Sequence, residues 1–217
     1  MQTYASRIAA AACIFVLAAA EAASQVAIDF PTAFERTPIA DSNYGWAFSV
    51  TVPITIDGLG LWDAGSDGLI ENHEVGLWRT FGNVGAPELI ASKVVSTNGS
   101  VPVASAFANG RWLFSPISPL TLEPGAYTIG ALYRAGGSAA SDPFVSDALT
   151  MFIAAGVDYG STREIHNTET LTCPTNFGLN EHNGFFGPNF RIVPEPSSAI
   201  LVLAGGWVLQ RRRRARG

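Results

Sequence analysis

Apolar side chains alternate with small or polar ones through the stretch GWAFSVTVPITIDGLGLWD, from Gly45 to Asp63. This period of two is typical of a β-strand with one buried face, and the side chains expected to be buried are Trp46, Phe48, Val50, Val52, Ile54 and Ile56. Pro53 indicates a sheet edge or a break, because proline cannot donate a ladder hydrogen bond. The alternation changes parity after Asp57-Gly58 and continues with Leu59 and Leu61, so we expect a β-bulge or a turn there.

Shorter stretches of the same kind follow, separated by glycine and proline. They predict further strands at His73–Arg79, Leu89–Thr97, Arg111–Ser115, Ala126–Arg134, Thr150–Asp158 and Phe185–Val193. Pro124-Gly125 is a turn signal, after which Tyr127, Ile129 and Tyr133 fall on one face. No long helical periodicity is present between the two ends of the chain. The sequence therefore predicts an all-β fold, an antiparallel β-sandwich that is jelly-roll-like.

Charge is scarce in this chain and unevenly distributed. Only 14% of the residues are charged, and between Gln25 and Val193 there are seven basic residues against 16 acidic ones. This acidic middle lacks the basic footprint of a nucleic-acid-binding protein, so no nucleic acid is expected as a partner. The length of 217 residues and an apolar content of 47% allow one packed domain, expected at residues 25–192, with appended segments at either end.

The amino-terminal end, residues 1–24, has the order of a secretory signal peptide. Arg7 precedes an apolar run of 13 residues from Ile8 to Ala20, and small-x-small cleavage patterns follow. The run is short of the ~20 residues that a spanning helix needs; a retained membrane helix is the alternative. Cleavage would remove Cys13 and leave Cys173 as the single cysteine, so no intramolecular disulfide is expected in the mature chain.

The carboxyl-terminal end, residues 193–217, has three parts. Prolines make the first part, Val193-Pro194-Glu195-Pro196, an extended tether instead of a helix. Ser197–Gln210 is an apolar stretch of 14 residues, which as a helix would be about 21 Å long against a hydrocarbon thickness of ~30 Å. A cluster of arginines, expected to stay on the cytoplasmic side by the positive-inside rule, ends the chain: Arg211, Arg212, Arg213, Arg214 and Arg216.

This order of parts, with a signal peptide before it, resembles the PEP-CTERM sorting signal of Gram-negative exported proteins. The resemblance implies that a membrane-embedded exosortase recognises Pro194-Glu195-Pro196, removes the short transmembrane helix and the arginine-rich tail, and passes the protein outward. It also implies transient anchoring in the inner membrane, contact with the secretion machinery, and a cell-surface, exopolysaccharide or biofilm context. A plain tail anchor without processing is the alternative.

A second resemblance concerns the middle of the chain. The segments HEVGLW, ELIASKVV and GRWLFSPISPLTLEPGAYTIGALY look like a β-sandwich domain of unknown function that is common among bacterial exported proteins. This resemblance covers Asp57–Arg134 and brings no catalytic residues with it.

The loop DAGSDGLIENHE holds several oxygen donors within a dozen residues. Asp63, Asp67 and Glu71 are candidate ligands for Ca²⁺, which prefers carboxylate and carbonyl oxygens. Their spacing departs from the EF-hand pattern, and the alternative is a solvated hairpin loop whose acids keep a sheet edge soluble. No other cofactor is expected.

Known catalytic motifs are not found in the sequence. His73 is not part of a His-Glu-x-x-His array, and Ser66 is not in a Gly-x-Ser-x-Gly elbow. We expect the three histidines at the polar surface and Cys173 as a buried or incidental thiol. Trp62 and Trp78 flank the acidic loop and are candidates for stacking on sugars, with core filling as the alternative.

These observations favour an exported, non-catalytic protein of the cell surface or extracellular matrix, sorted by an exosortase. The alternative is a carbohydrate-binding module that acts on exopolysaccharide. An enzyme is not expected.

Overall fold

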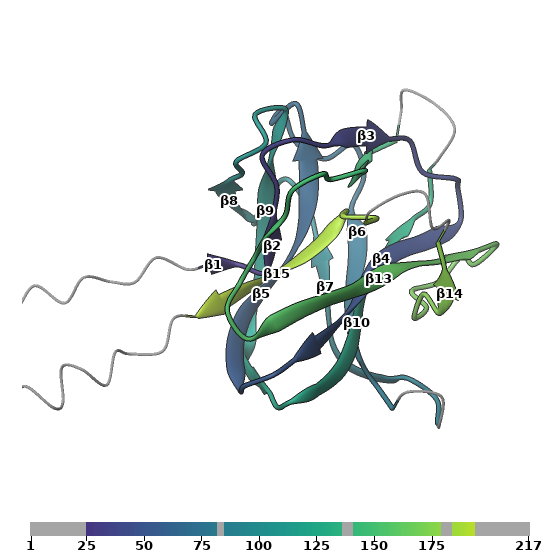
Figure 1. Cartoon of the computed structure of the whole chain (residues 1–217). Helices are drawn as coiled ribbons and strands as arrows, with labels where there is room; N and C mark the ends of the chain where they lie inside the picture. Colours follow the sequence, from purple (N-terminus) through teal and green to yellow (C-terminus); the bar gives the residue numbers. More distant parts are fainter. Residues whose placement is uncertain (1–24, 82–84, 136–140, 179–183, 194–217) are drawn as a thin grey trace, which may run out of the picture.

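The computed structural model describes residues 25–81, 85–135, 141–178 and 184–193. Within these ranges the chain forms 15 strands and no helix. Two antiparallel sheets pack face to face, as Figure 1 shows, and the predicted antiparallel β-sandwich is therefore confirmed. The expected signal peptide, Pro194 to Pro196, the apolar carboxyl-terminal helix and the arginine cluster lie outside the described residues. Among the described residues, no helix has the length and apolar character needed to cross a membrane.

One sheet has five strands, in the order β1, β15, β5, β9, β8. Their bounds are β1 Gln25–Val26, β15 Pro188–Val193, β5 Ile54–Ala64, β9 Gly110–Leu122 and β8 Val101–Ala104. The other sheet has six strands, in the order β14, β13, β4, β10, β6, β7. Their bounds are β14 Asn176–Phe177, β13 Val157–His166, β4 Ser42–Val50, β10 Gly125–Tyr133, β6 His73–Thr80 and β7 Glu88–Val95.

Two short strand pairs accompany the main sheets. β3 (Phe34–Arg36) pairs with β11 (Phe144–Ser146), and β2 (Ile28–Asp29) pairs with β12 (Phe152–Ile153). At the edge of the five-stranded sheet, Gln25 of β1 lies opposite Ile192 of β15. The two ends of the described body therefore lie side by side at one edge of one layer (Figure 1).

The core between the two sheets is rich in aromatic rings. Trp46 stacks on Phe190 of the facing sheet with 5.8 Å between ring centroids, and its indole nitrogen donates a hydrogen bond of 2.9 Å to the carbonyl of Pro188. Trp62 and Trp112, both fully buried, meet edge to face at 5.2 Å. Each large apolar side chain enclosed in this way contributes about 1.5–3 kcal/mol to folding, and the paired rings add specific geometry.

The period of two in the sequence predicts which face of each central strand is buried. Trp46, Phe48 and Val50 of β4 all face the core, as do Tyr127, Ile129 and Tyr133 of β10. The expected irregularity at Asp57 is confirmed, because the register of β5 against β9 shifts between Ile56 and Gly58. Leu59 and Leu61 are consequently buried with the new parity.

Three strand predictions need correction: those at Val52, at Thr150–Asp158 and at Arg111–Ser115. Val52 is 56% exposed, because β4 ends at Val50 and residues 51–53 connect it to β5. The strand predicted at Thr150–Asp158 is interrupted by a turn at Gly156, whose φ of 84° requires glycine, and β13 instead runs from Val157 to His166.

β9 is longer than the predicted Arg111–Ser115, although it includes two prolines. β8 pairs only with residues 111–114 of β9. Beyond Ser115, no strand of the described part of the chain pairs with that side of β9. Prolines there interrupt no ladder hydrogen bond.

Candidate functional site

The acidic loop between β5 and β6 does not gather its carboxylates. Asp63 is fully buried and is held by Arg111, whose Nε lies 2.7 Å from Asp63 Oδ2. The amide of Gly68, a residue with φ of 105°, donates to the other oxygen, Oδ1, at 2.9 Å. Asp67 is exposed. Both oxygens of Asp63 are therefore already engaged by donors from the protein.

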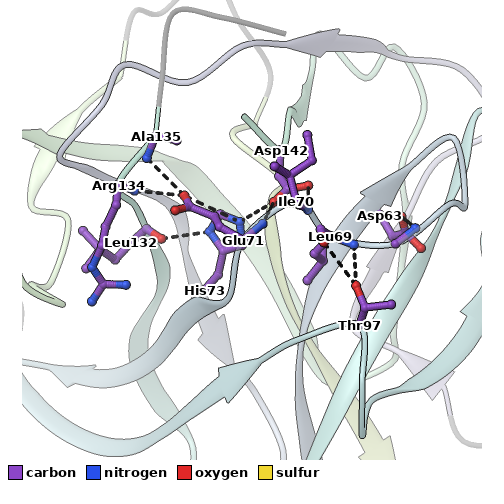
Figure 2. A network of polar contacts seen from close by, with 11 residues as sticks. Asp63, Leu69, Ile70, Glu71, His73, Thr97, Leu132, Arg134, Ala135 and Asp142 are labelled. Atoms are coloured by element: carbon purple, nitrogen blue, oxygen red, sulfur yellow. Dashed lines mark hydrogen bonds and ion pairs between the residues drawn. The ribbon is translucent and has the colours of Figure 1, made fainter. Parts of the chain in front are cut away.

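Glu71, at the other end of the loop, faces a different part of the molecule. Its Oε1 accepts hydrogen bonds from the amides of Arg134 at 3.1 Å and Ala135 at 3.2 Å. In Figure 2 Asp63 lies at the right, apart from Glu71, whose carboxylate is joined to Arg134 and Ala135. No three histidine, cysteine, aspartate or glutamate side chains within the described ranges could hold a metal ion together. Asp63, Asp67 and Glu71 therefore do not fit the calcium site expected from the loop.

The loop is instead fastened by a buried pair, His73 and Asp142 (Figure 2). His73 Nε2 lies 2.8 Å from Asp142 Oδ2, and His73 Nδ1 lies 2.9 Å from the carbonyl oxygen of Leu132. The amides of Ile70 and Glu71 donate to the same carboxylate at 2.9 and 3.1 Å. Asp142 thus ties the start of β6 to the segment before β11.

His73 corrects the expectation of a surface histidine, because its side chain is fully buried. Both ring nitrogens lie within hydrogen-bond distance of an oxygen, so the ring is held from two sides. Burial acts to raise the pKa of Asp142, but the hydrogen bond from His73 and those from the Ile70 and Glu71 amides lower it below its ordinary value. The pair is best described as an enclosed hydrogen-bonded pair that joins two loops.

Tyr133 packs against this pair with its ring centroid 4.7 Å from that of His73. Its hydroxyl is the buried side-chain polar atom for which the described part of the chain provides no hydrogen-bond partner. Burial raises the pKa of Tyr133 well above its ordinary value, so the phenol stays neutral.

The other histidine within the described ranges, His166, is half-buried and bonds the hydroxyl of Ser42 at 2.9 Å. His182 lies outside the described residues.

Trp62 and Trp78 are buried, and the prediction that they stack on sugars is wrong for both. Trp62 is fully enclosed in the core, and its indole nitrogen donates to Glu35 Oε1 at 3.0 Å. Trp78 is 5% exposed and lies on the outer face of the six-stranded sheet, over Gly76. Neither ring has a face open to a ligand.

Glycine makes that position of Trp78 possible. A side chain at Gly130 would place its Cβ 2.7 Å from Pro174 and 3.4 Å from the indole of Trp78. Gly130 and Gly76 are opposite each other in the register of β10 and β6. Their missing side chains let Trp78 and the segment at Pro174 lie directly on the sheet, and this covers the indole.

Beside Pro174 the outer face of the six-stranded sheet is hollowed. We call this hollow, of about 620 Å³, the outer groove. Its floor consists of small outward-facing residues on β4, β10 and β13, namely Ala47, Ser49, Ala126, Thr128 and Ser161. Its walls are formed at β6 and β7 on one side and at β14 on the other, by Phe81, Pro87, Pro174, Thr175 and Phe177. The volume is within the ~300–1,000 Å³ range of small-ligand sites.

Two exposed phenylalanines form part of these walls, and an arginine accompanies each. Phe177 is 69% exposed, and the guanidinium of Arg163, its cross-strand partner, lies 3.9 Å from the ring centroid. Phe81 is 49% exposed, with the guanidinium of Arg79 at 5.7 Å. Arg163 also donates to the carbonyl of Thr175 at 3.2 Å. Such cation–π contacts fix the direction of a guanidinium group.

Cys173 lies beneath the same wall. Its thiol is buried, and burial raises its pKa to about 12, although Arg163 and a hydrogen bond with Thr128 act in the opposite direction. At neutral pH the thiol is protonated and hence a poor nucleophile. The lining residues of the outer groove that the structure describes include no histidine and no carboxylate.

Sequence reasoning missed Arg163, Phe177 and Phe81. Arg163 and Phe177 meet only through the pairing of β13 with β14, which the local pattern does not show. The one available signal was two large apolar residues, Phe81 and Phe177, next to glycines outside any clear alternation.

Comparison with known proteins adds no assignment: no protein-family model, curated protein or solved structure matches this chain.

Proposed function

We propose that this chain is an exported, non-catalytic protein of the cell surface or extracellular matrix, sorted by an exosortase through its carboxyl-terminal signal. The observation that carries the proposal is the order of parts in the sequence: an apolar run after Arg7 precedes the body, and Pro194-Glu195-Pro196, a short apolar stretch and an arginine cluster follow it. The described body between them is an antiparallel sandwich whose first and last strands, β1 and β15, pair with each other.

The polar groups of the body favour a non-catalytic role. The histidine–carboxylate pair of His73 and Asp142 is enclosed, and each partner is occupied by several hydrogen bonds. Cys173 is a buried thiol with a raised pKa of about 12. A general base must reach its substrate, and neither group is accessible.

The sorting proposal is tested by replacing both prolines of the motif, Pro194→Ala with Pro196→Ala, in cells that contain an exosortase. We expect the variant to keep its tail and remain in the membrane fraction, whereas the native chain is shortened and released. Ser197→Ala with Ser198→Ala, immediately beyond the motif, is the matched control and is expected to be released. The intact mass of each product reports both terminal cuts. Release of a shortened proline variant at the native level contradicts the proposal.

A second function, carbohydrate binding, is favoured by the outer groove. The groove combines exposed aromatic rings with a floor that includes the hydroxyl groups of Ser49 and Ser161. A sugar presents an apolar face and a polar edge, which suits both kinds of surface. We place this activity at the groove, since Trp62 and Trp78 are enclosed.

A further inference from the structure

We propose that the outer groove binds an anionic saccharide chain, with Phe177 and Phe81 stacking on sugar rings and Arg163 binding a sugar carboxylate. The inference rests on the carbohydrate-binding function proposed above and adds to it the charge of the ligand and the residues that recognise it.

The first step is the state of the arginines in the body. Four of them form ion pairs with carboxylates, in the pairs Arg36–Asp147, Arg111–Asp63, Arg134–Glu74 and Arg191–Asp57. Arg163 and Arg79 differ from these four, since within the described ranges neither forms an ion pair with a carboxylate. Each instead lies against a phenylalanine of the groove wall. In a body with more than twice as many acids as bases, an arginine without a carboxylate partner that lines a groove, Arg163, is a specific feature.

The second step is charge complementarity. Arg163 is the one charged residue among the described lining residues of the groove, and no carboxylate lines it to cancel that charge. An approaching anion therefore meets a positive site within an otherwise acidic surface. The guanidinium has five N–H donors, of which one is directed at the carbonyl of Thr175. The others can form the forked pair with a carboxylate for which arginine is suited.

The third step is the chemistry of the rest of the groove. Phe177 and Phe81 are exposed side chains at opposite walls, and Arg163 lies over one face of the Phe177 ring. Between them, Ser49, Ser161 and Thr175 are exposed or half-exposed hydroxyl residues that can bond sugar hydroxyls. A uronic acid carries all three matching features, namely an apolar ring face, hydroxyl groups and a carboxylate. An acidic polypeptide would satisfy the arginine but would leave the ring faces and hydroxyls largely unused.

The fourth step is accessibility. The groove lies on the outer face of the six-stranded sheet, whereas Val193 ends β15 in the other sheet. A tether at Val193 therefore starts from the opposite layer of the sandwich (Figure 1). The protein can be attached through that end while the groove faces away from the point of attachment.

The test uses the full-length chain, purified in a non-ionic detergent, and titration calorimetry with three probes. The probes are alginate oligosaccharides, neutral dextran oligosaccharides of the same length, and polyglutamate. We expect alginate to bind at least about tenfold more tightly than dextran, because one charge-assisted hydrogen-bonded contact is worth about 1.5–3 kcal/mol. We also expect the affinity to fall as salt is added, and polyglutamate to bind more weakly than alginate.

Variants assign the binding to the groove. Arg163→Gln and Phe177→Ala are each expected to weaken alginate binding by about tenfold or more, by the same reasoning on charge-assisted contacts and aromatic stacking. Arg79→Gln, which changes the arginine beside Phe81 and not a lining residue of the groove, is a second probe that does not touch the residues around Arg163. The matched controls are Lys93→Gln, an exposed cation on β7, and Phe152→Ala, an exposed phenylalanine on β12 that is 55% exposed. Thermal unfolding checks that each variant is folded.

The possible outcomes separate the two proposals. Equal binding of alginate and dextran, lost in Phe177→Ala, overturns the anionic ligand but supports carbohydrate binding. Binding of neither saccharide overturns both, and stronger binding of polyglutamate overturns the saccharide in favour of an acidic polypeptide. Alginate binding that survives Arg163→Gln and Arg79→Gln overturns the assignment to this groove. None of these results bears on sorting, which the proline variant tests separately.

Discussion

Replacing Asp142 by asparagine removes the carboxylate charge from a buried hydrogen-bonded pair without changing the size of the side chain. Asp142 is 6% exposed in its side chain and His73 is fully buried. The carboxylate accepts from His73 at 2.8 Å and from the amides of Ile70 and Glu71 at 2.9 and 3.1 Å. An asparagine offers one acceptor oxygen and turns an NH₂ group toward donors, so at least one buried donor loses its partner.

The expected cost follows from that arrangement. Leaving a buried donor without its hydrogen-bond partner typically costs about 1–3 kcal/mol, because that group stays desolvated. A domain of ordinary stability has about 5–15 kcal/mol in total, so the change is large. Equilibrium unfolding in urea, followed by tryptophan fluorescence, measures it, because Trp46, Trp62 and Trp112 are fully buried in the folded chain.

The matched control is Glu74→Gln, which breaks the ion pair with Arg134. Those two side chains are 39% and 44% exposed, and exposed pairs of this kind contribute about 0.2–1 kcal/mol. We therefore expect Asp142→Asn to lower the unfolding free energy several times more than Glu74→Gln. Equal effects of the two substitutions would refute the reasoning that burial makes the His73–Asp142 pair a structural clamp.

Two further predictions follow from the pKa shifts. Because the pKa of Asp142 is lowered in the folded chain, the stability it contributes is present above the ordinary carboxyl value and is lost as the pH falls below about 4. The difference in urea midpoint between the native chain and Asp142→Asn should therefore shrink between pH 7 and pH 3, and a constant difference would contradict this. For Cys173, whose pKa is raised to about 12, a Cys13→Ser background isolates the single thiol. Iodoacetamide at pH 7.5 should label it at least about a hundredfold more slowly in buffer than in urea, where the pKa returns to about 8.5. Equal rates would show that the thiol is accessible and ionised.

Local alternation was sufficient to predict the class of fold. The spacing of Trp46, Phe48 and Val50 sets which face of β4 is buried, and it depends only on the pleat of one strand. The same logic found the bulge near Asp57, since a change of parity within one strand is visible in the sequence itself. The end of β4 was misjudged because Val52 continues the apolar pattern into a turn.

The candidate sites depended on contacts that sequence spacing does not specify. Asp63 and Glu71 are eight positions apart, yet Arg111 engages the first and the amides at 134 and 135 engage the second. Arg111 lies on β9 and residues 134 and 135 directly follow β10, so both sets of partners are distant in the chain. The loop sequence alone suggested that its carboxylates share one site, whereas these contacts separate them. Trp62 was misread for a related reason. It lies at a strand end beside an acidic loop, but the facing Trp112 and Phe30 enclose it.

The outer groove illustrates what only the register can supply. Ala47 lies opposite both Thr128 of β10 and Ser161 of β13, so small side chains from three strands meet in one row on the outer face. Along the sequence Ala47 merely occupies the outward position between Trp46 and Phe48, and Thr128 that between Tyr127 and Ile129. The same alternation that fills the core with large rings leaves small residues outside. Where neighbouring strands align such residues, and Phe81 and Phe177 stand at either side, the sheet acquires a floor and walls that can receive a ligand.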